Sequence, residues 1–294
     1  MKFITLYHLI FIVKIKIIMK VCILGNGLTS LMLAKALVNK EIFVDIISAN
    51  KIEYFNKSRT LGISKTNVEF INKNILNITK FLWNINKIEV YSQNLKKEKV
   101  LNFNNKEENL FSIIKNHKLI NHLTKKLNEN NFCRFKKKII NEDKIHYYNL
   151  VINCDPSNPM TKKFFSKKIK KNYESYAHTT IINHKKLLNN RVAVQIFTGV
   201  GPLAFLPISE TETSVVYSVR GNKDLDLNKI INMYNTKYKV KKLTKPYLFE
   251  LKSSNLRNYY YKNILAFGDL LHKIHPLAGQ GFNMTIRDIK ELVN

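Results

Sequence analysis

The stretch KVCILGNGLTSLMLAKALV at residues 20–38 decides the fold class of this chain. Residues 20–24 form a short apolar run, which is typical of a buried strand in a parallel sheet. Gly25 and Gly27 follow, and the apolar residues after them recur at helical spacing. A second apolar run at residues 43–47 completes a strand–helix–strand unit of ordinary length. The stretch therefore predicts a Rossmann-like α/β domain.

The glycine loop in this stretch is suited to binding a dinucleotide. It reads GNGLTS, with Ser30 where a third glycine is usual. Gly25 permits a tight turn, Gly27 lets the backbone approach a pyrophosphate, and the small Ser30 keeps the helix close to the sheet. The helix start offers unpaired N–H groups and the positive end of a dipole to phosphate. An ordinary strand–helix turn is the alternative interpretation.

The acidic residue that usually binds the adenosine ribose is missing from its expected place. That place, at the end of the second strand, holds Ser48. Asp45 lies three residues earlier, on the opposite face of the strand, and Glu53 lies in the following loop. A neutral hydroxyl binds ribose less strongly than a carboxylate does. This departure weakens the prediction of tight dinucleotide binding.

A second informative stretch, LAFGDLLHKIHPLAGQGFNMTIRD, occupies residues 265–288. A buried strand ends there at Gly268 and Asp269, and the Asp269 carboxylate can accept hydrogen bonds from a ribose or ribityl hydroxyl. Gly279 and Gly281 allow backbone N–H groups to approach a ring carbonyl closely. The helix that begins near them favours negative charge at its start. The stretch predicts a second contact with the same dinucleotide.

The remaining patterns predict two domains whose segments alternate along the chain. Strands alternate with helices at the start, an antiparallel section follows, and a strand and a helix end the chain. We expect a strand pair at 88–91 and 100–103, a helix at 109–127, a hairpin at 131–155 ending in a buried strand at 150–153, strands within 176–220, a helix at 224–238, a strand at 264–267 and a helix at 281–292. The nucleotide-binding domain would comprise residues 19–70, 106–158 and 263–294, and the substrate domain residues 71–105 and 159–262.

The composition limits the possible partners. The formal net charge of +28 would usually suggest a nucleic-acid binder. The chain holds 43 Lys but only 6 Arg, a bias typical of an AT-rich genome. Nucleic-acid sites favour Arg because its guanidinium makes bidentate contacts. We therefore expect no nucleic-acid partner, and we expect the lysines to attract an anionic membrane surface weakly.

Residues 1–18 are interpreted separately from the domain. Their apolar run, FITLYHLIFIV, is shorter than the roughly 20 residues that a spanning helix needs. No signal-peptide cleavage site follows it. Met19 stands directly before the first predicted strand, so our interpretation is a leader produced by a mis-called start. The alternative is an anchor that lies in the membrane interface.

The metal-ligating residues do not form a recognisable set. Cys22, Cys133 and Cys154 lie far apart and are odd in number, which argues against a disulfide framework or a zinc site and fits a reducing cytoplasm. His272 and His275 are three residues apart, but no third ligand is evident. We expect no metal.

The motif GD-x-x-H-x-x-HPLAGQG-x-N at residues 268–283 resembles the second FAD motif of the aromatic-ring flavin hydroxylases of ubiquinone biosynthesis. These enzymes belong to the para-hydroxybenzoate hydroxylase class of FAD monooxygenases. Residues 197–207, FTGVGPLAFLP, resemble a run that lies in the substrate sheet of that family, next to the flavin. The turn within this run could also be purely architectural.

Two further segments carry the resemblance. Residues 58–64, SRTLGIS, are similar to the segment whose arginine lies along FAD, so Arg59 is a candidate contact. A solvated loop charge is the alternative. Asp155 occupies the place of the middle motif of the family, where Asp-Gly is usual, but Pro156 follows it here. Proline removes a backbone donor, so a surface turn is an equal alternative at this position.

The resemblance implies an interleaved Rossmann-like FAD-binding domain and antiparallel-sheet substrate domain. It implies that FAD carries the chemistry and that no side chain acts as a nucleophile. The residues expected to contact FAD are Gly25, Gly27, Ser30, Arg59, Asp155, Gly268, Asp269, Pro276, Gly279, Gln280, Gly281 and Asn283. Those at 279–283 are expected to face the isoalloxazine ring.

The implied activity is hydroxylation of the aromatic ring of a polyprenylated phenol or quinol, with NAD(P)H and O2. The protein would work in the cytoplasm, peripherally on the inner membrane, and a ubiquinone-synthesis complex is a further expected partner. The alternative is a non-catalytic, degenerate flavoprotein-like subunit of such a complex. Ser30, Ser48 and Pro156 favour that alternative, as does the end of the chain at Asn294, where family members continue.

Overall fold

The computed structural model describes residues 19–49, 57–93, 99–104, 109–138, 142–221, 224–274 and 279–294. The interpretation of residues 1–18 lies outside the described residues. So do the expected FAD contact at Pro276 and the comparison of His275 with a metal ligand.

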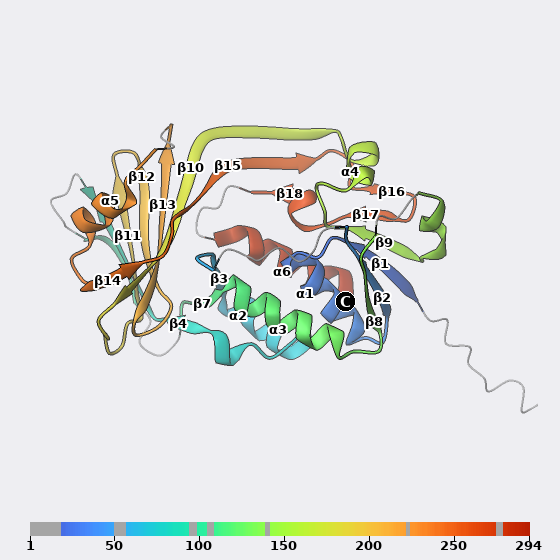
Figure 1. The fold of residues 1–294 in the computed structure, drawn as a ribbon, viewed down its shortest axis with the longest axis horizontal. Helices are drawn as coiled ribbons and strands as arrows, with labels where there is room; N and C mark the ends of the chain where they lie inside the picture. Colours follow the sequence, from blue (N-terminus) through green and yellow to red (C-terminus); the bar gives the residue numbers. More distant parts are fainter. Residues whose placement is uncertain are drawn as a thin grey trace, which may run out of the picture.

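A six-stranded sheet contains the first strand of the described chain (Figure 1). Its order is β16-β17-β9-β1-β2-β8, and every neighbouring pair is parallel except β16–β17. The predicted parallel sheet is confirmed, and Gly25 and Gly268 both follow the carboxyl ends of its strands. The strands are β1 (Lys20–Leu24), β2 (Phe43–Ile47), β8 (Cys133–Lys136), β9 (Leu150–Asn153), β16 (Tyr260–Tyr261) and β17 (Ile264–Ala266).

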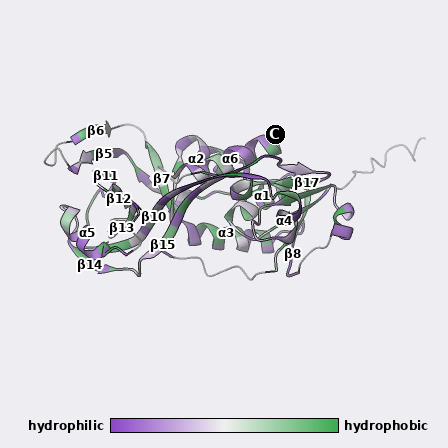
Figure 2. Cartoon of the chain, turned by 90° about the horizontal axis from the view of Figure 1, so that it is seen from above, coloured by the Kyte–Doolittle hydropathy of each residue, from purple (hydrophilic) through white to green (hydrophobic). Residues whose placement is uncertain are grey.

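Both faces of this sheet are buried, as expected for parallel strands. On one face Val21, Ile23 and Ile46 pack in a cluster with four helices, and on the other Cys22 packs with a smaller set of short elements. The four helices are α1 (Leu28–Val38), α2 (Lys65–Asn74), α3 (Asn116–Asn128) and α6 (Gln280–Val293). The short elements are the 3-10 helices η4 (Glu142–Tyr147) and η5 (Gly268–Leu270) and the helix α4 (Pro159–Phe164). Figure 2 shows hydrophobic and hydrophilic colours on α3, as expected for a helix with one buried face.

The second large unit is a nine-stranded sheet with the order β18-β15-β10-β13-β12-β11-β5-β6, and β14 pairs with β10. The predicted strand pair at 88–91 and 100–103 is confirmed as β5–β6. Helix α5 (Leu227–Tyr234) covers one face of this sheet. The strands are β5 (Lys87–Ser92), β6 (Lys99–Asn104), β10 (Lys168–His184), β11 (Val192–Thr198), β12 (Gly201–Pro207), β13 (Glu212–Arg220), β14 (Val240–Leu243), β15 (Tyr247–Leu256) and β18 (His272–Lys273).

A three-stranded sheet joins the two large units. It consists of β3 (Thr60–Ser64), β7 (Phe111–Lys115) and β4 (Trp83–Ile85), which follows the 3-10 helix η2 (Thr79–Phe81).

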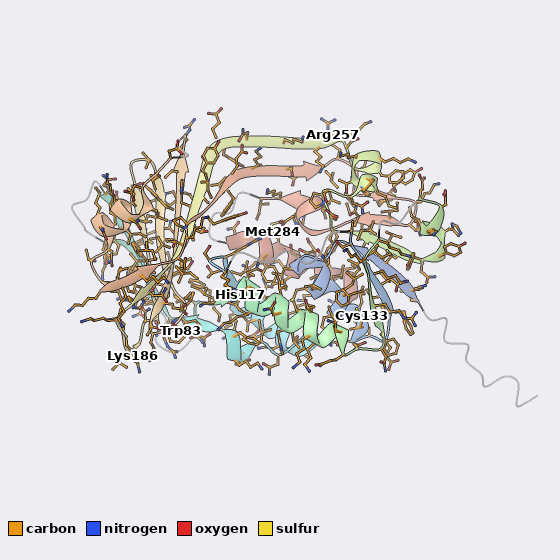
Figure 3. All side chains as sticks on the ribbon, viewed as in Figure 1. Trp83, His117, Cys133, Lys186, Arg257 and Met284 are labelled. Carbon is orange, nitrogen blue, oxygen red and sulfur yellow. The ribbon has the colours of Figure 1, made fainter. Side chains whose placement is uncertain are left out.

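Polar contacts tie this small sheet to the nine-stranded sheet. Lys115 Nζ donates to both carboxylate oxygens of Glu212 at 2.8 Å, and Thr60 Oγ1 lies 3.0 Å from Ser214 Oγ. The indole N–H of Trp83, labelled in Figure 3, donates to a backbone carbonyl next to β11 at 2.6 Å. These partly buried contacts fix the nine-stranded sheet against the small sheet.

Three predicted elements differ from the structure. The helix expected over 109–127 is β7 followed by α3, because β7 pairs with both β3 and β4 and the buried Ile113 and Ile114 suit a strand. The hairpin expected over 131–155 does not form, since β8 pairs with β2 and β9 pairs with β1. The helix expected over 224–238 is the shorter α5. The residue boundaries of the two domains stay a prediction.

Replacing Gly268 by alanine is expected to destabilise the protein. Gly268 has φ +63°, and a Cβ there would lie 2.6 Å from Thr29 Cγ2. Backbone strain and the clash together should lower the free energy of unfolding by about 1–3 kcal/mol. Urea unfolding measures the loss. The control is Gly199→Ala in a turn, where the nearest atom is 3.9 Å away and the change should stay within about 0.5 kcal/mol. Equal stabilities would refute the close approach at Gly268.

Candidate cofactor site

The glycine loop follows β1 in a conformation that requires glycine at position 25. Gly25 has φ +102°, and its N–H donates to the carbonyl of Ile47 at 2.9 Å. A Cβ at Gly25 would lie 3.1 Å from the Cβ of Asp155. Gly27 caps α1 without a side-chain hydrogen bond, and a Cβ there would meet nothing within 4 Å. Among the described residues, the start of α1 thus has neither a capping side chain nor an atom close to the Gly27 Cβ position, which suits an anion site.

Ser30 lies beneath this loop. Its side chain is 1% exposed, and its hydroxyl oxygen would be 3.4 Å from a Cβ at Gly25. Burial raises the pKa of the Cys154 thiol to about 12, and the side chain of Ser30 opposes part of that rise. Ser30 thus packs helix against sheet at the place of the third glycine, and it does not face the open space.

The GD motif meets the start of α1. The N–H of Phe267 donates to the carbonyl of Asn153 at 2.9 Å, which continues the strand pairing to the edge of the sheet. Gly268 then turns against the side chain of Thr29 in the first turn of α1. The exposed Asp269 follows directly. Two motifs from opposite ends of the sequence therefore lie in contact, and Asp269 directly follows the residue that touches the first turn of α1.

Asp155 has features of a cofactor contact and of a surface turn. Its Cβ lies against Gly25, so the middle motif does reach the glycine loop. Its carboxylate oxygen, however, accepts hydrogen bonds from the N–H and the hydroxyl of Ser157 at 2.8 and 2.6 Å. Its carbonyl accepts one from Thr161 Oγ1 at 2.8 Å. The residue thus orders the turn that begins α4 while standing beside the candidate site.

The start of α6 is fixed by Asn283. Its side-chain oxygen accepts hydrogen bonds from the N–H of Ser64 at 3.0 Å and from Asn67 Nδ2 at 2.8 Å. Its side-chain nitrogen donates to the carbonyls of Gly62 at 2.8 Å and Gly279 at 3.1 Å. The Asn283 side chain is therefore used within the protein and joins α6 to β3 and α2.

Gly279 gives this helix start its shape. It has φ +67°, and a Cβ there would lie 3.8 Å from the backbone of Gly62. Gln280 and Gly281 begin the helix, with no acidic residue in the first turn. Any contact of this segment with a ring carbonyl would thus come from the backbone of Gln280 and Gly281.

Arg59 stands at the entry to β3. Its side chain is exposed, and its carbonyl accepts a hydrogen bond from the N–H of Asn116 at 3.0 Å. It lies three residues before Gly62, which packs against Gly279. Arg59 is therefore connected through β3 to the start of α6, with its charge in solvent.

Asp45 belongs to a different cluster. Its carboxylate accepts hydrogen bonds from Lys136 Nζ and from the hydroxyl of Tyr148, each at 2.7 Å. Burial alone would raise the pKa of Asp45, but these hydrogen bonds outweigh it and lower the pKa. Asp45 is thus paired within the sheet and does not replace the missing ribose ligand near Ser48.

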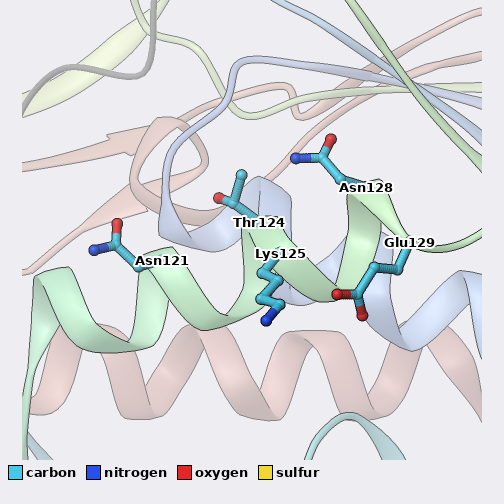
Figure 4. Close-up of a pocket in the computed structure, with 5 residues that line it drawn as sticks. All are labelled: Asn121, Thr124, Lys125, Asn128 and Glu129. Carbon is cyan, nitrogen blue, oxygen red and sulfur yellow. The ribbon is translucent and has the colours of Figure 1, made fainter.

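Sequence reasoning missed the partners of the motif residues. Thr29 lies against Gly268, Gly62 lies beside Gly279, and Asn67 binds Asn283. A glycine signals close approach, but what approaches it depends on the fold. Figure 4 shows a separate pocket on α3 that shares no lining residue with these motifs; it is lined by Asn121, Thr124, Lys125, Asn128 and Glu129.

No family model matches the chain. The chain is similar to ubiquinone biosynthesis monooxygenase COQ6 of Homo sapiens, with 27% identity over 167 residues that cover 42% of this chain and 36% of that protein. It is 31% identical over 110 residues to 3-demethoxyubiquinol 3-hydroxylase of Escherichia coli (strain K12), covering 34% of this chain and 28% of that protein. The matches thus span about a third of the length of these relatives. They confirm the resemblance to ubiquinone-biosynthesis hydroxylases.

Solved structures share the fold over nearly the whole chain. PqsL of Pseudomonas aeruginosa, in complex with 2-aminobenzoylacetate, has a TM-score of 0.74 at 15% identity and covers 94% of this chain and 85% of that one. HpxO of Klebsiella pneumoniae, complexed with FAD, has a TM-score of 0.71 at 13% identity and covers 94% and 80%. These likenesses confirm the predicted fold class, a mixed α/β fold that FAD-dependent monooxygenases share.

Replacing Asn283 by alanine should loosen the start of α6. The change leaves Asn67 and the Ser64 N–H without their partner, which should lower the free energy of unfolding by about 1–3 kcal/mol. Thermal or urea unfolding of the FAD-free chain measures this. The matched control is Asn121→Ala, an exposed asparagine on α3, for which a change below about 0.5 kcal/mol is expected. A loss no larger than that of the control would contradict the joining role of Asn283.

Proposed function

We propose that this relative of the ubiquinone-biosynthesis monooxygenases is an FAD-dependent hydroxylase of an aromatic ubiquinone precursor. One observation carries the proposal: Gly25, Asp155 and Gly268 come together where α1 begins without a cap. Ligands of open α/β sheets bind at this carboxyl edge. The homologues in ubiquinone synthesis support the pathway, and the fold supports the cofactor.

The residues at this edge fit the parts of FAD. The N-terminus of α1 has no side-chain cap, and no described atom lies within 4 Å of the Gly27 Cβ position, so it suits the pyrophosphate. Asp269 would accept hydrogen bonds from a ribityl or ribose hydroxyl, and the backbone of Gln280 and Gly281 would face the ring. Arg59 would flank the bound cofactor. Bound FAD would supply the redox chemistry, with NAD(P)H as reductant and O2 as oxidant, by resemblance to the family.

The nine-stranded sheet offers a face for an aromatic substrate. Residues paired directly across antiparallel strands share a face. One face packs Leu203, Val215 and Tyr217 under α5. The opposite face contains Ser214, which contacts Thr60 of the small sheet, and therefore points toward the nucleotide-binding unit. Val216, two residues after Ser214, lies on the same face. The residues aligned with it across the neighbouring strands are Gln195, Ala204, Thr179 and Tyr247.

Aromatic side chains on this inner face are partly exposed. Phe197 is 48% exposed, Tyr247 49% and Phe249 37%. Ala204 on β12 and Thr179 on β10 lie on the same face, on strands between those that carry Phe197 and Tyr247. Such a surface suits a phenol ring and part of a prenyl chain. The chain's own role in the reaction would be to place the ring, exclude water and hold the cofactor.

A specific observation keeps the alternative function open to test. The Asp155 carboxylate is used in a turn with Ser157, and Pro156 stands where the family has glycine. A degenerate, non-catalytic subunit would show this loss of a cofactor contact. Flavin absorbance of the purified protein, followed by NADH oxidation with a quinone precursor present, separates the two. Bound flavin with precursor-dependent oxidation supports the hydroxylase, and bound flavin without oxidation supports the subunit.

Replacing Asp269 by alanine should weaken FAD binding. The change removes a charge-assisted hydrogen bond worth about 1.5–3 kcal/mol. The dissociation constant for FAD, measured by flavin fluorescence, should therefore rise about ten- to a hundredfold. The control is Asp143→Ala, an exposed acidic residue in η4, which should leave the FAD affinity unchanged. Equal affinities for Asp269→Ala and wild type would make Asp269 a turn residue only.

Within the described parts of the chain, no helix is both long and apolar enough to cross a bilayer. The membrane association that we propose is therefore assigned to a surface. Four exposed tyrosines lie at the end of the molecule that holds α4 and β16 (Figure 1), and we call them the tyrosine surface: Tyr147, Tyr259, Tyr260 and Tyr261.

The tyrosine surface is a connected structure. Asn263 Nδ2 donates to the carbonyl of Tyr148 at 2.9 Å, which joins the β16–β17 turn to η4. The rings of Phe164 and Tyr261 stack at 4.3 Å, which adds α4. Exposed lysines surround it at Lys144, Lys162 and Lys262. Tyrosine rings prefer a membrane interface and lysines attract anionic lipid, so this end suits peripheral binding.

The liposome affinity of the full chain should depend on this surface. Binding to anionic vesicles of phosphatidylglycerol should weaken with salt, because salt screens the lysines. Tyr147→Ser with Tyr260→Ser should lower the affinity about tenfold or more. The matched control is Leu188→Ser with Met233→Ser, two residues exposed by 76% and 69% on other parts of the molecule. Equal losses in both variants would exclude the tyrosine surface. No binding by wild type would favour substrate delivery by a partner protein.

A further inference from the structure

His272, the first histidine of the GD motif, forms an ion pair with Asp288 at the end of the same stretch, and neither residue was given a role above. His272 Nε2, on β18, lies 3.1 Å from Asp288 Oδ2, on α6. The two side chains are only 17% and 28% exposed, and the paired atoms themselves are buried. Within the described residues, neither of these two atoms has a hydrogen-bonding partner, so they meet as an ion pair when the imidazole is protonated.

This pair connects α6 to the nine-stranded sheet. His272 is held in register with Asn255 where β18 pairs with β15, and the N–H of Leu256 donates to the carbonyl of Leu271 at 3.0 Å. In Figure 1, β18 lies beside α6, between that helix and the long strands β10 and β15. The position of Asp288 is thus tied to a strand that cannot shift without breaking sheet pairing.

Three restraints then act on α6 from different directions. Asn283 binds β3 and α2, Ile286 and Ile289 pack in the core with α1, and Asp288 contacts β18. Apolar packing alone leaves a helix free to rotate slightly about its axis. Two polar anchors on either side of the apolar stripe remove that freedom, and the rotation of the helix sets where its first N–H groups point.

We propose that His272 is a positioning residue that, through Asp288, sets the rotation of α6 and thereby aims the backbone N–H groups of Gln280 and Gly281 at the cofactor. The inference rests on the proposed function, because it assigns those N–H groups to the ring of FAD. His272 itself would touch neither cofactor nor substrate. Its effect on the cofactor passes through the ion pair and the helix.

The pair depends on pH in a defined direction. The interaction with Asp288 raises the pKa of His272, burial opposes that rise, and Asp269 on η5 adds to it. The other charged residues beside the pair in sequence, Lys273 and Arg287, are exposed. A histidine whose pKa is raised on folding contributes its full stabilisation below the unfolded value of about 6.5. The contribution is lost as the pH rises through the folded value.

The experiment measures FAD affinity and His272 titration in the full chain. In the wild type, the dissociation constant for FAD should rise as the pH increases through the His272 transition. Asp288→Asn should raise it about three- to tenfold at low pH and abolish the pH dependence. His272→Gln keeps an N–H donor toward Asp288. This variant should therefore keep much of the FAD affinity that the wild type has at low pH, but its affinity should not depend on pH. The matched control is Glu129→Gln, which removes the 2.9 Å ion pair with Lys126 on α3 and should change neither quantity.

Nuclear magnetic resonance of the FAD-free chain provides the independent readout. It should show a raised His272 pKa in the wild type and a lower one in Asp288→Asn. If the wild type titrates in this way but binds no FAD, the proposed function fails and the pair stands. If it binds FAD with an affinity that ignores the His272 transition, the positioning role is overturned, and this result needs no variant to fold. A pH dependence that persists unchanged in Asp288→Asn overturns it as well.

Discussion

The contact between Gly268 and Thr29 is the constraint on which the rest of the structure depends. A Cβ at Gly268 would lie 2.6 Å from the Thr29 side chain, so no other residue fits there without displacement. The contact holds the end of β17 against the first turn of α1. Because β17 pairs with β9 and β9 with β1, the same contact closes a circuit through the sheet. The open helix start and Asp269 are adjacent for this reason.

Around this contact, side chains stabilise the protein itself, and backbone groups face the candidate cofactor site. Ser30 and Asn283 use their side chains inside the protein, one beneath the loop and one between α6, β3 and α2. Gly27 and the backbone at Gln280 and Gly281 are then the parts that can meet a cofactor. This division suits an enzyme whose cofactor carries the chemistry, because the protein must then mainly bind, orient and shield.

Local sequence patterns predicted the elements whose signals are short-range. The strand at 20–24, the loop at Gly25 and the helix after Gly279 follow from apolar runs and from glycines that adopt positive φ. Elements decided by distant partners were not predictable in this way. The apolar residues within 111–115 continue the helical spacing of the residues that follow, but pairing with β3 and β4 makes this segment a strand. Likewise β8 joined β2, a strand from far earlier in the chain.

The same limit applies to the candidate site. Gly25, Gly268 and Asp269 could be named from motifs, whereas Thr29, Gly62 and the His272–Asp288 pair became visible only when distant segments met. The most direct test of the account is an experimental structure of the full chain with FAD. The account predicts the pyrophosphate at the start of α1 and the ring beside the backbone of Gln280 and Gly281. FAD bound elsewhere, with the start of α1 empty, would contradict it.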